Sequence, residues 1–292
     1  MFLKSNINLF SLSKRINRPL ILDGAMGSLL QQKGLKNNGS MWMSLANIEN
    51  PEIVFQIHQD YINAGADIIT TNTFRTNPAA IKGFKLDNKS LVRKSVEIAT
   101  EAVKDLPIFI AGSNAPSEDC YQVLRTFTHK ELEYNHHKHI NLLYENGVDF
   151  ILNETQSHFD EIKIICKYCS KNDIPYIISI FLENTNKILS NNNIIDIIKF
   201  ISNYNPIAIG FNCILPKLFL KVFPTINIDF NWGMYLNLGS GNYTDEKIET
   251  FISPIDYKKT IKKTLKYNPS FVGACCGSTP GHIKEIKKLL DE

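Results

Sequence analysis

The amino-acid sequence predicts a single α/β domain folded as a (β/α)8 (TIM) barrel. Along its 292 residues, short β-branched apolar runs alternate with longer amphipathic segments, which is the pattern of parallel βαβ units. Eight such runs occur, as many as the barrel has strands. The runs are almost continuously apolar, as expected for strands that are covered on both faces. An open, doubly wound sheet is the alternative fold.

Each predicted strand is a short run bounded by polar or glycine-containing segments. In chain order, the strands are predicted over residues 20–23, 67–72, 108–113, 149–154, 176–181, 207–212, 232–237 and 271–275. The clearest helix lies between the first two strands, where Asn50 is a candidate N-cap, Pro51 suits the first helical position and Gly65 follows the end. Its apolar residues at helical spacing are Ile53, Val54, Ile57 and Tyr61.

One unit of the chain is repeated. The stretch "NAGADIITTNT" at 63–73 is echoed by "ENGVDFILNET" at 145–155. In each, a glycine closes a helix and an aspartate opens a strand. Repetition of a helix-to-strand junction supports an architecture built from successive βα units.

The amino-acid composition limits which binding partners and which cellular location we expect for the protein. The net charge of +3 without a dense basic patch argues against nucleic-acid binding, and the apolar runs are too short to span a membrane. Six cysteines in a chain of this length do not resemble a disulfide framework, so we expect a reducing, cytoplasmic location.

The first eighteen residues are basic and contain no acidic residue. Lys4, Lys14, Arg15 and Arg18 lie in this segment, which lacks the long apolar stretch of a secretory signal. We interpret residues 1–18 as an N-terminal lead-in to a barrel that occupies 19–292. A short organelle presequence is the alternative.

Polar and sulfur-bearing side chains collect where the predicted strands end. A (β/α)8 barrel places its working groups at the carboxyl ends of its strands. The residues at these ends are Asp23, Thr71, Asn72, Thr73, Asn153, Glu154, Asn212, Cys213, Asn237, Cys275 and Cys276. Their common position predicts a functional site at this rim.

The stretch "FVGACCGSTPGHI" at 271–283 places two adjacent cysteines between glycines. Neighbouring side chains on a strand point to opposite faces, so Cys275 and Cys276 converge only if the strand breaks there. Gly273 and Gly277 permit such a break, because glycine reaches backbone angles closed to other residues. A disulfide between neighbours is disfavoured, which leaves a metal site, a reactive thiol or two buried cysteines.

A third cysteine, Cys213, falls on the same rim. Three thiolates suit Zn²⁺, and the fourth position of a catalytic zinc site stays open for substrate. A thiol bound there is held as an electron-rich thiolate, which can attack an electrophilic carbon such as that of a cationic methyl donor. Asp23 and Glu154 could then hold the ammonium group of an amino-acid substrate, although barrel-end salt bridges or loop caps explain them equally well.

The sequence resembles the homocysteine S-methyltransferase family. The matching stretches are "LDGAMGSLLQQKG", "AGADIITTNTF", "GVDFILNET", "GFNC", "YLNLG" and "GACCGSTPGHI", in the family's order and over about residues 20–290. The resemblance implies an enzyme that moves a methyl group onto homocysteine sulfur and makes methionine. It implies that Cys213, Cys275 and Cys276 hold zinc. It also implies a homocysteine pocket that contains Asp23 and Glu154, with Thr73 and Asn237 as further substrate-binding residues.

The methyl donor is a weaker implication of the resemblance. Cobalamin-dependent members carry further domains and betaine users carry a C-terminal extension, and we expect neither here, so S-methylmethionine or S-adenosylmethionine is the expected donor. Trp42 in "MWMS" could stack against a sulfonium, or could simply pack a loop. Departures from the family pattern are Leu236 and Leu238 in "YLNLG" and Asn114-Ala115 in "GSNAP".

Two other readings of the function stay open. The chain could be a stand-alone homocysteine-binding module that depends on a cobalamin or folate partner, or a non-catalytic zinc- or thiol-binding protein. Two further patterns are discounted: Cys166 and Cys169 are expected to be buried cysteines, and His136 and His139 are expected to lie on a solvated helix face.

Overall fold

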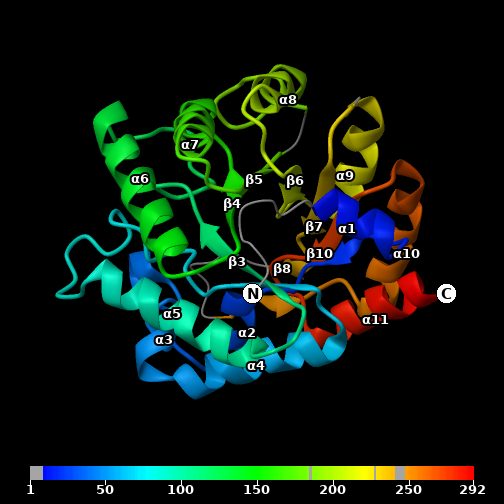
Figure 1. Cartoon of the computed structure of the whole chain (residues 1–292), viewed down its shortest axis with the longest axis horizontal. Helices are drawn as coiled ribbons and strands as arrows, with labels where there is room; N and C mark the ends of the chain where they lie inside the picture. The colour runs from blue at the N-terminus through cyan, green and yellow to red at the C-terminus, as the bar shows by residue number, and fades with distance from the viewer. Residues whose placement is uncertain (1–8, 184–185, 227, 241–246) are drawn as a thin grey trace.

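The computed structural model describes residues 9–183, 186–226, 228–240 and 247–292, and in it parallel strands form a barrel surrounded by helices (Figure 1). The barrel strands are β1 (Leu20–Ile21), β2 (Ile68–Thr70), β3 (Phe109–Asn114), β4 (Phe150–Gln156), β5 (Tyr176–Ile180), β6 (Ala208–Asn212), β7 (Trp232–Leu236) and β10 (Phe271–Ala274). Each lies within or overlaps one of the eight runs that the sequence predicted, so the strand predictions are confirmed.

Backbone pairing closes these strands into a ring. The order is β1-β10-β7-β6-β5-β4-β3-β2, with parallel neighbours throughout. A parallel bridge between Leu22 and Ile68 joins the two ends of this order. On either side of it, Asp23 N donates to Ile68 O at 2.9 Å and Asp67 N donates to Ile21 O at 2.7 Å. The predicted barrel is therefore confirmed, and the open sheet is wrong.

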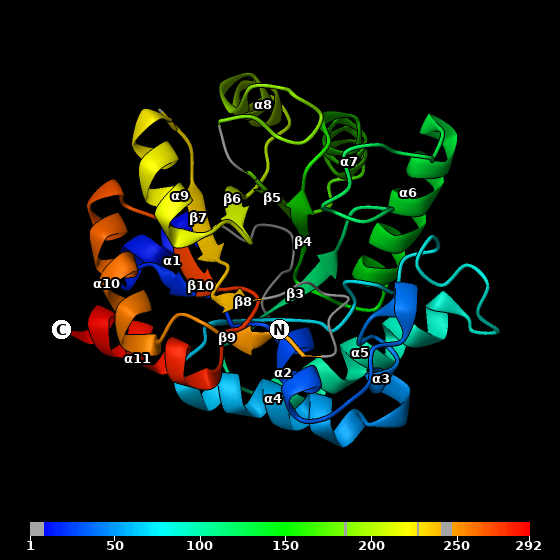
Figure 2. The same cartoon turned by 180° about the vertical axis from the view of Figure 1, so that it is seen from behind.

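Helices cover the outside of the ring, as the view from behind also shows (Figure 2). They are α4 (Pro51–Ala64), α5 (Asn88–Val103), α6 (His129–Glu145), α7 (Phe159–Lys171), α8 (Ile194–Ser202), α9 (Pro216–Val222), α10 (Pro254–Thr264) and α11 (Pro280–Asp291). Shorter helices α2 (Met26–Gln32) and α3 (Ala46–Glu49) lie in the connection from β1 to α4. A small antiparallel pair, β8 (Gly239–Ser240) and β9 (Glu249–Thr250), follows β7 and was not predicted.

Helix α4 shows how the local sequence determines an element. Pro51 occupies the first turn, and Gly65 ends the helix in the left-handed region at φ 105°. Val54, Ile57 and Tyr61 are buried, as their spacing predicted, whereas Ile53 is half-buried. Asn50 occupies the N-cap position, as predicted, but its side chain makes no capping hydrogen bond; its carbonyl accepts from the first turn.

The apolar residues form two cores, one inside the barrel and one between barrel and helices. The inner core consists of Leu20, Leu22, Ile68, Ala111, Phe150, Leu152, Ile177, Ala208, Tyr235 and Phe271. The outer core takes the alternate strand residues and the inward faces of the helices. Burial on both faces explains why the strands read as continuous apolar runs, and it makes the barrel a rigid base for its rim.

The repeated unit owes its likeness to a shared hydrogen bond. Gly65 and Gly147 both have left-handed φ angles, of 105° and 103°. The carboxylate two residues later then accepts a backbone N–H from the preceding strand: Asp67 Oδ2 from Ile21 and Asp149 Oδ2 from Ile110, both at 2.7 Å. The aspartates that open strands two and four thus fasten each strand to its neighbour at the amino end of the barrel.

Part of the predicted N-terminal lead-in packs on this amino end. Helix α1 (Leu9–Arg15) contacts β1, and Leu12 packs against the inner core beside Phe109 and Ile207. Arg18 pairs with Asp67 at 2.6 Å. Residues 1–8 lie outside the described residues, and the boundary at residue 18 stays a prediction. Within the described chain, no helix is long and apolar enough to cross a membrane.

We expect Asp67→Asn to lower the free energy of unfolding by about 1–3 kcal/mol, because it weakens charge-assisted hydrogen bonds to Arg18 and Ile21 at the closure of the barrel. Urea unfolding followed by circular dichroism measures the loss. Arg18→Gln and the double variant complete a mutant cycle. Strictly additive losses would show that the Arg18–Asp67 pair does not contribute.

Candidate metal centre and substrate pocket

A pocket opens at the carboxyl ends of the barrel strands. It contains about 830 Å³ of empty space, part of it open to solvent. Its lining comes from the carboxyl-terminal residues of β2, β3, β4, β7 and β10 and from the segments that follow β1, β2, β3, β6 and β10. These are the strand ends where the sequence places polar and sulfur-bearing residues, so the rim and the pocket coincide.

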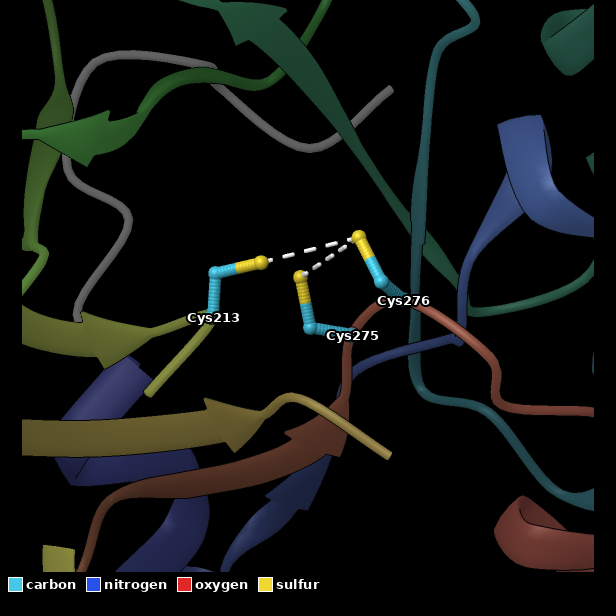
Figure 3. Close-up of side chains that lie close together, drawn as sticks. All are labelled: Cys213, Cys275 and Cys276. Atoms are coloured by element: carbon cyan, nitrogen blue, oxygen red, sulfur yellow. Dashed lines mark hydrogen bonds between the residues drawn. The ribbon is translucent and has the colours of Figure 1, made fainter. Parts of the chain in front are cut away.

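Three cysteines meet in this pocket. Cys213 follows β6, whereas Cys275 and Cys276 follow β10, and Figure 3 shows their side chains turned toward one another. The sulfur of Cys276 lies 3.5 Å from that of Cys213 and 3.9 Å from that of Cys275. All three sulfurs lie within 4.8 Å of one another, and all three are free thiols. Such a group can hold one metal ion.

The backbone after β10 lets adjacent cysteines face the same point. Cys275 N still donates to Leu236 O of β7 at 2.8 Å, but the next ladder bond runs from Leu238 N to Cys276 O. Gly277 then takes φ 75°, and a Cβ on it would lie 2.3 Å from Gly239 Cα. The break predicted for Gly277 is therefore present. Gly273 plays a different part, since it lies inside β10 and leaves room for Leu22, which follows β1.

Cys213 occupies a strained position and is the most readily ionised of the three. Its φ is 56°, in the left-handed region, which is unfavourable for residues other than glycine. Hydrogen bonds from Cys275 and Cys276 hold the pKa of Cys213 well below its ordinary value, and the same bonds raise the pKa of the two donors. The hydroxyl of Tyr121 lies 3.0 Å from the Cys213 sulfur and adds a donor to this thiolate.

Two carboxylates share the pocket with the cysteines. Asp23 is 2% exposed and accepts hydrogen bonds from the backbone N and Oγ1 of Thr70, both at 2.8 Å. Glu154 is half-buried and accepts from the hydroxyl of Ser113. Burial raises the pKa of Asp23 to about 8 and that of Glu154 to about 7. A cationic ligand bound beside these carboxylates would stabilise their ionised forms and lower both pKa values.

A bulge in β4 places Glu154. The register between β4 and β5 shifts between Asn153 and Gln156, and Thr155 takes a φ of 54°. Thr155 N donates to Asn212 Oδ1 at 2.8 Å, and Asn212 Nδ2 donates back to Thr155 Oγ1 at 2.9 Å. This reciprocal pair of hydrogen bonds joins β4 to β6. Thr155 directly follows Glu154, and Asn212 directly precedes Cys213. The pair therefore fixes Glu154 and Cys213 relative to each other.

Thr73 and Asn237 lie beside the pocket and are not among its lining residues. Thr73 is fully buried and bonds through its hydroxyl to Ser113 O and Thr71. Asn237 accepts from Gly239 N at 2.9 Å and shapes the turn after β7. In the structure, both side chains form hydrogen bonds that hold neighbouring segments in place. Their contact with substrate stays a prediction.

Trp42 lines the pocket opposite the strands. Its ring lies across Gly27 of α2, where a Cβ would approach it to 2.3 Å, and meets Phe74 edge to face at 6.0 Å. Trp42 itself has a φ of 46°. Together with Phe74 it makes an aromatic wall, which suits a cationic ligand.

The sequence patterns missed several lining residues. They are Arg75, Cys120, Tyr121 and Tyr235. Two of them lie in the connection after β3, where no periodicity marks a functional position. The family departures do not reach the pocket surface: Leu236, Leu238 and Asn114 are fully buried and absent from the lining.

The discounted patterns have mixed outcomes. Cys166 and Cys169 are buried in α7, as expected. The solvated face expected for His136 and His139 is wrong, because both are fully buried. His136 pairs with Glu161 of α7, and His139 bonds to Thr76 and Asn114. Thr76 after β2, Asn114 at the end of β3 and Glu161 of α7 thus give the two imidazoles partners that the chain order does not reveal.

Comparison with known proteins is consistent with this geometry. The family model described as homocysteine S-methyltransferase matches residues 20–290. Homocysteine S-methyltransferase 2 of Arabidopsis thaliana is 26% identical over 92% of both chains. Homocysteine S-methyltransferase of Escherichia coli is 26% identical over 92% of this chain and 94% of its own. Selenocysteine Se-methyltransferase of Brassica oleracea is 26% identical over 92% and 88%.

Solved structures share the fold. The metallated form of the homocysteine methyltransferase MmuM from Escherichia coli superposes with a TM-score of 0.79 at 24% identity. The match covers 92% of this chain and 96% of that one. At this identity the likeness supports the barrel architecture.

We expect Tyr121→Phe to weaken Zn²⁺ binding by about tenfold, because outer hydrogen bonds to metal ligands typically carry 10–100-fold in affinity. The variant keeps the ring that packs edge to face on Phe181 and removes the hydroxyl beside Cys213. Competition with a chromophoric chelator measures the affinity. Tyr176→Phe is the matched control, because its hydroxyl bonds to Tyr204 O away from the pocket. Equal affinities in all three proteins would refute the role of Tyr121.

Proposed function

The chain belongs to the homocysteine S-methyltransferase family, and from that premise we propose that it transfers a methyl group from a small sulfonium donor to homocysteine sulfur at a zinc ion. The product is methionine. The observation that carries the proposal is the convergence of three thiols with the carboxylates of Asp23 and Glu154 in one pocket.

The cysteine cluster suits zinc in both chemistry and spacing. Thiolates are soft ligands that favour Zn²⁺ over Mg²⁺ or Ca²⁺. Tetrahedral zinc with Zn–S bonds of about 2.3 Å separates its sulfur ligands by about 3.8 Å. The separations of 3.5 and 3.9 Å lie on either side of that value. When bound, zinc supplies a Lewis acid that lowers the pKa of the acceptor thiol into the neutral range.

The chain's own residues orient the acceptor. Asp23 and Glu154 would bind the homocysteine ammonium group. Burial raises the pKa of both carboxyl groups, and the positive charge of the ammonium would favour their ionised forms. Thr70 and Ser113 keep these carboxylates in place through hydrogen bonds. With the amino-acid end fixed there, the sulfur end of the ligand is directed to the cysteine cluster.

The donor would lie against the aromatic wall of Trp42 and Phe74. A sulfonium is attracted to aromatic faces and to the negative charge of the pocket. In the transfer, a lone pair of the acceptor sulfur forms the new S–CH3 bond, and the pair of the breaking C–S bond returns to the donor sulfur, which becomes a neutral thioether. The chain needs only to align the two sulfurs with the methyl carbon between them.

The expected setting follows from the same residues. We propose a cytoplasmic location, supported by six free cysteines that include the reactive cluster. The partners would be small molecules, homocysteine and its methyl donor. A module that depends on a cobalamin partner, or a protein that only binds, would share the cluster and differ in turnover.

The first test is methionine formation by the zinc-loaded protein from homocysteine. S-methylmethionine, S-adenosylmethionine, betaine and methyl-cobalamin are compared as donors in parallel. Turnover with a sulfonium that a chelator abolishes is the expected result. Activity only with methyl-cobalamin would establish the partner-dependent alternative, and binding of zinc and homocysteine without any turnover would establish the binding protein.

We expect Cys276→Ser to lose zinc and methyl transfer together, because two thiolates cannot replace the three-sulfur site. Zinc content by atomic absorption and methionine production are measured on the same samples. Cys120→Ala is the matched control: Cys120 lines the pocket but lies outside the three-cysteine group. A metal-free, active Cys276→Ser protein would refute the assignment.

Asp23→Asn should raise the KM for homocysteine by about 30-fold or more, since a buried charged hydrogen bond to the substrate ammonium typically carries ~2 kcal/mol or more. The amide keeps the size of the side chain and an acceptor for Thr70. Steady-state kinetics with homocysteine varied at saturating donor measure the change. An unaltered KM would exclude Asp23 from the ammonium site.

A further inference from the structure

The pocket contains a buried arginine that the transfer reaction described above does not use. Arg75 follows Phe74 in the segment after β2, lines the pocket and is only 7% exposed. Its Nη1 donates to the carbonyl of Glu118 at 2.9 Å. A guanidinium has five N–H donors and is charged at any physiological pH, so one carbonyl leaves most of its capacity unmet.

Other sheltered arginines of the chain have acidic partners. Arg18 pairs with Asp67, and Arg125 pairs with Asp160 and Glu161. Arg75 has no carboxylate partner among the described residues. A buried charge without a counter-ion is costly, and proteins keep one chiefly where a ligand supplies the opposite charge.

The position of Arg75 points to the donor side of the pocket. Its guanidinium lies 5.3 Å from the centre of the Phe74 ring, and Phe74 in turn contacts Trp42. The acidic side chains that line the pocket, Asp23 and Glu154, are held by Thr70 and Ser113 and are matched to an ammonium group. Arg75 thus offers the complementary charge on the aromatic wall.

We propose that Arg75 binds the carboxylate of the methyl donor and makes the enzyme selective for zwitterionic, amino-acid sulfonium donors. The proposal rests on the proposed function and names the donor class for it. A fixed cation in the pocket repels a donor that carries only positive charge. A donor with a carboxylate removes that penalty and can accept two parallel N–H bonds from the guanidinium fork.

A purely structural role for Arg75 makes a different prediction. The bond to Glu118 O ties the segment after β2 to the loop after β3, and a neutral donor can make such a bond. Arg75→Gln keeps a neutral N–H donor, on a shorter side chain, and removes the charge. Arg75→Lys keeps the charge and loses the planar fork. The two variants separate loop anchoring from carboxylate recognition.

The experiment compares S-methylmethionine with its decarboxylated analogue, (3-aminopropyl)dimethylsulfonium, as methyl donors. For Arg75→Gln we expect kcat/KM to fall about 100-fold with S-methylmethionine and to be unchanged or higher with the analogue, because the variant removes the charge that repels a purely cationic donor. Arg75→Lys should lie between wild type and Arg75→Gln. The KM for homocysteine should be unchanged, and thermal melting confirms that the variants fold.

Three outcomes would overturn the proposal. Equal losses with both donors would assign Arg75 to loop structure, a raised KM for homocysteine would assign it to the acceptor, and unchanged kinetics would remove it from recognition. Calorimetric binding of the two sulfonium compounds to zinc-loaded wild type and Arg75→Gln gives a readout without turnover. If wild type turns over no sulfonium, the proposed function fails, and a carboxylate preference lost in Arg75→Gln still identifies the subsite; absence of that preference overturns it.

Discussion

Closure of the parallel barrel is the constraint on which the site depends. The backbone bonds from Asp23 to Ile68 and from Asp67 to Ile21 join the first strand to the second and complete the ring. Only a closed ring brings the carboxyl ends of all strands around one axis. Cys213 and Cys276, 63 positions apart in the chain, thereby come within 3.5 Å of each other. Asp67 and Asp149 lie at the amino end of the barrel, far from the cysteines. They support the cysteine cluster indirectly, because they hold neighbouring strands together.

The rim stores local strain that the packed barrel can hold. Trp42, Thr155 and Cys213 all have positive φ angles, although none is a glycine. Such residues cost of order 1–3 kcal/mol each and persist only where surrounding structure determines them. For Thr155 the determining contact is the reciprocal pair with Asn212, which also sits next to Cys213. All three of these residues line the pocket, so the strained backbone lies at the site itself.

The sequence predicted what depends on periodicity and on motif position. The strands were predicted correctly because their burial on both faces produces continuous apolar runs in the sequence. The three cysteines were identified because each closely follows a predicted strand. It could not predict Tyr121 or Arg75, because their roles arise from how the loops after β2 and β3 fold over the pocket. The error for His136 and His139 also comes from tertiary contacts. Their partners Glu161 and Asn114 come from α7 and β3, and helical spacing alone carries no information about such partners.

The distribution of charge in the pocket gives a physical account of how two similar substrates could be told apart. Homocysteine and an amino-acid sulfonium both carry an ammonium and a carboxylate, so neither group alone distinguishes them. The pocket lining combines the acidic side chains of Asp23 and Glu154 with the basic side chain of Arg75, which lies over the Phe74 ring. A donor placed with its carboxylate at Arg75 has its sulfonium free to face the cysteine cluster. An acceptor placed with its ammonium at Asp23 has its sulfur directed to the same cluster from the barrel side. With these proposed roles, the acidic and basic side chains would align the two sulfurs for transfer before any bond changes.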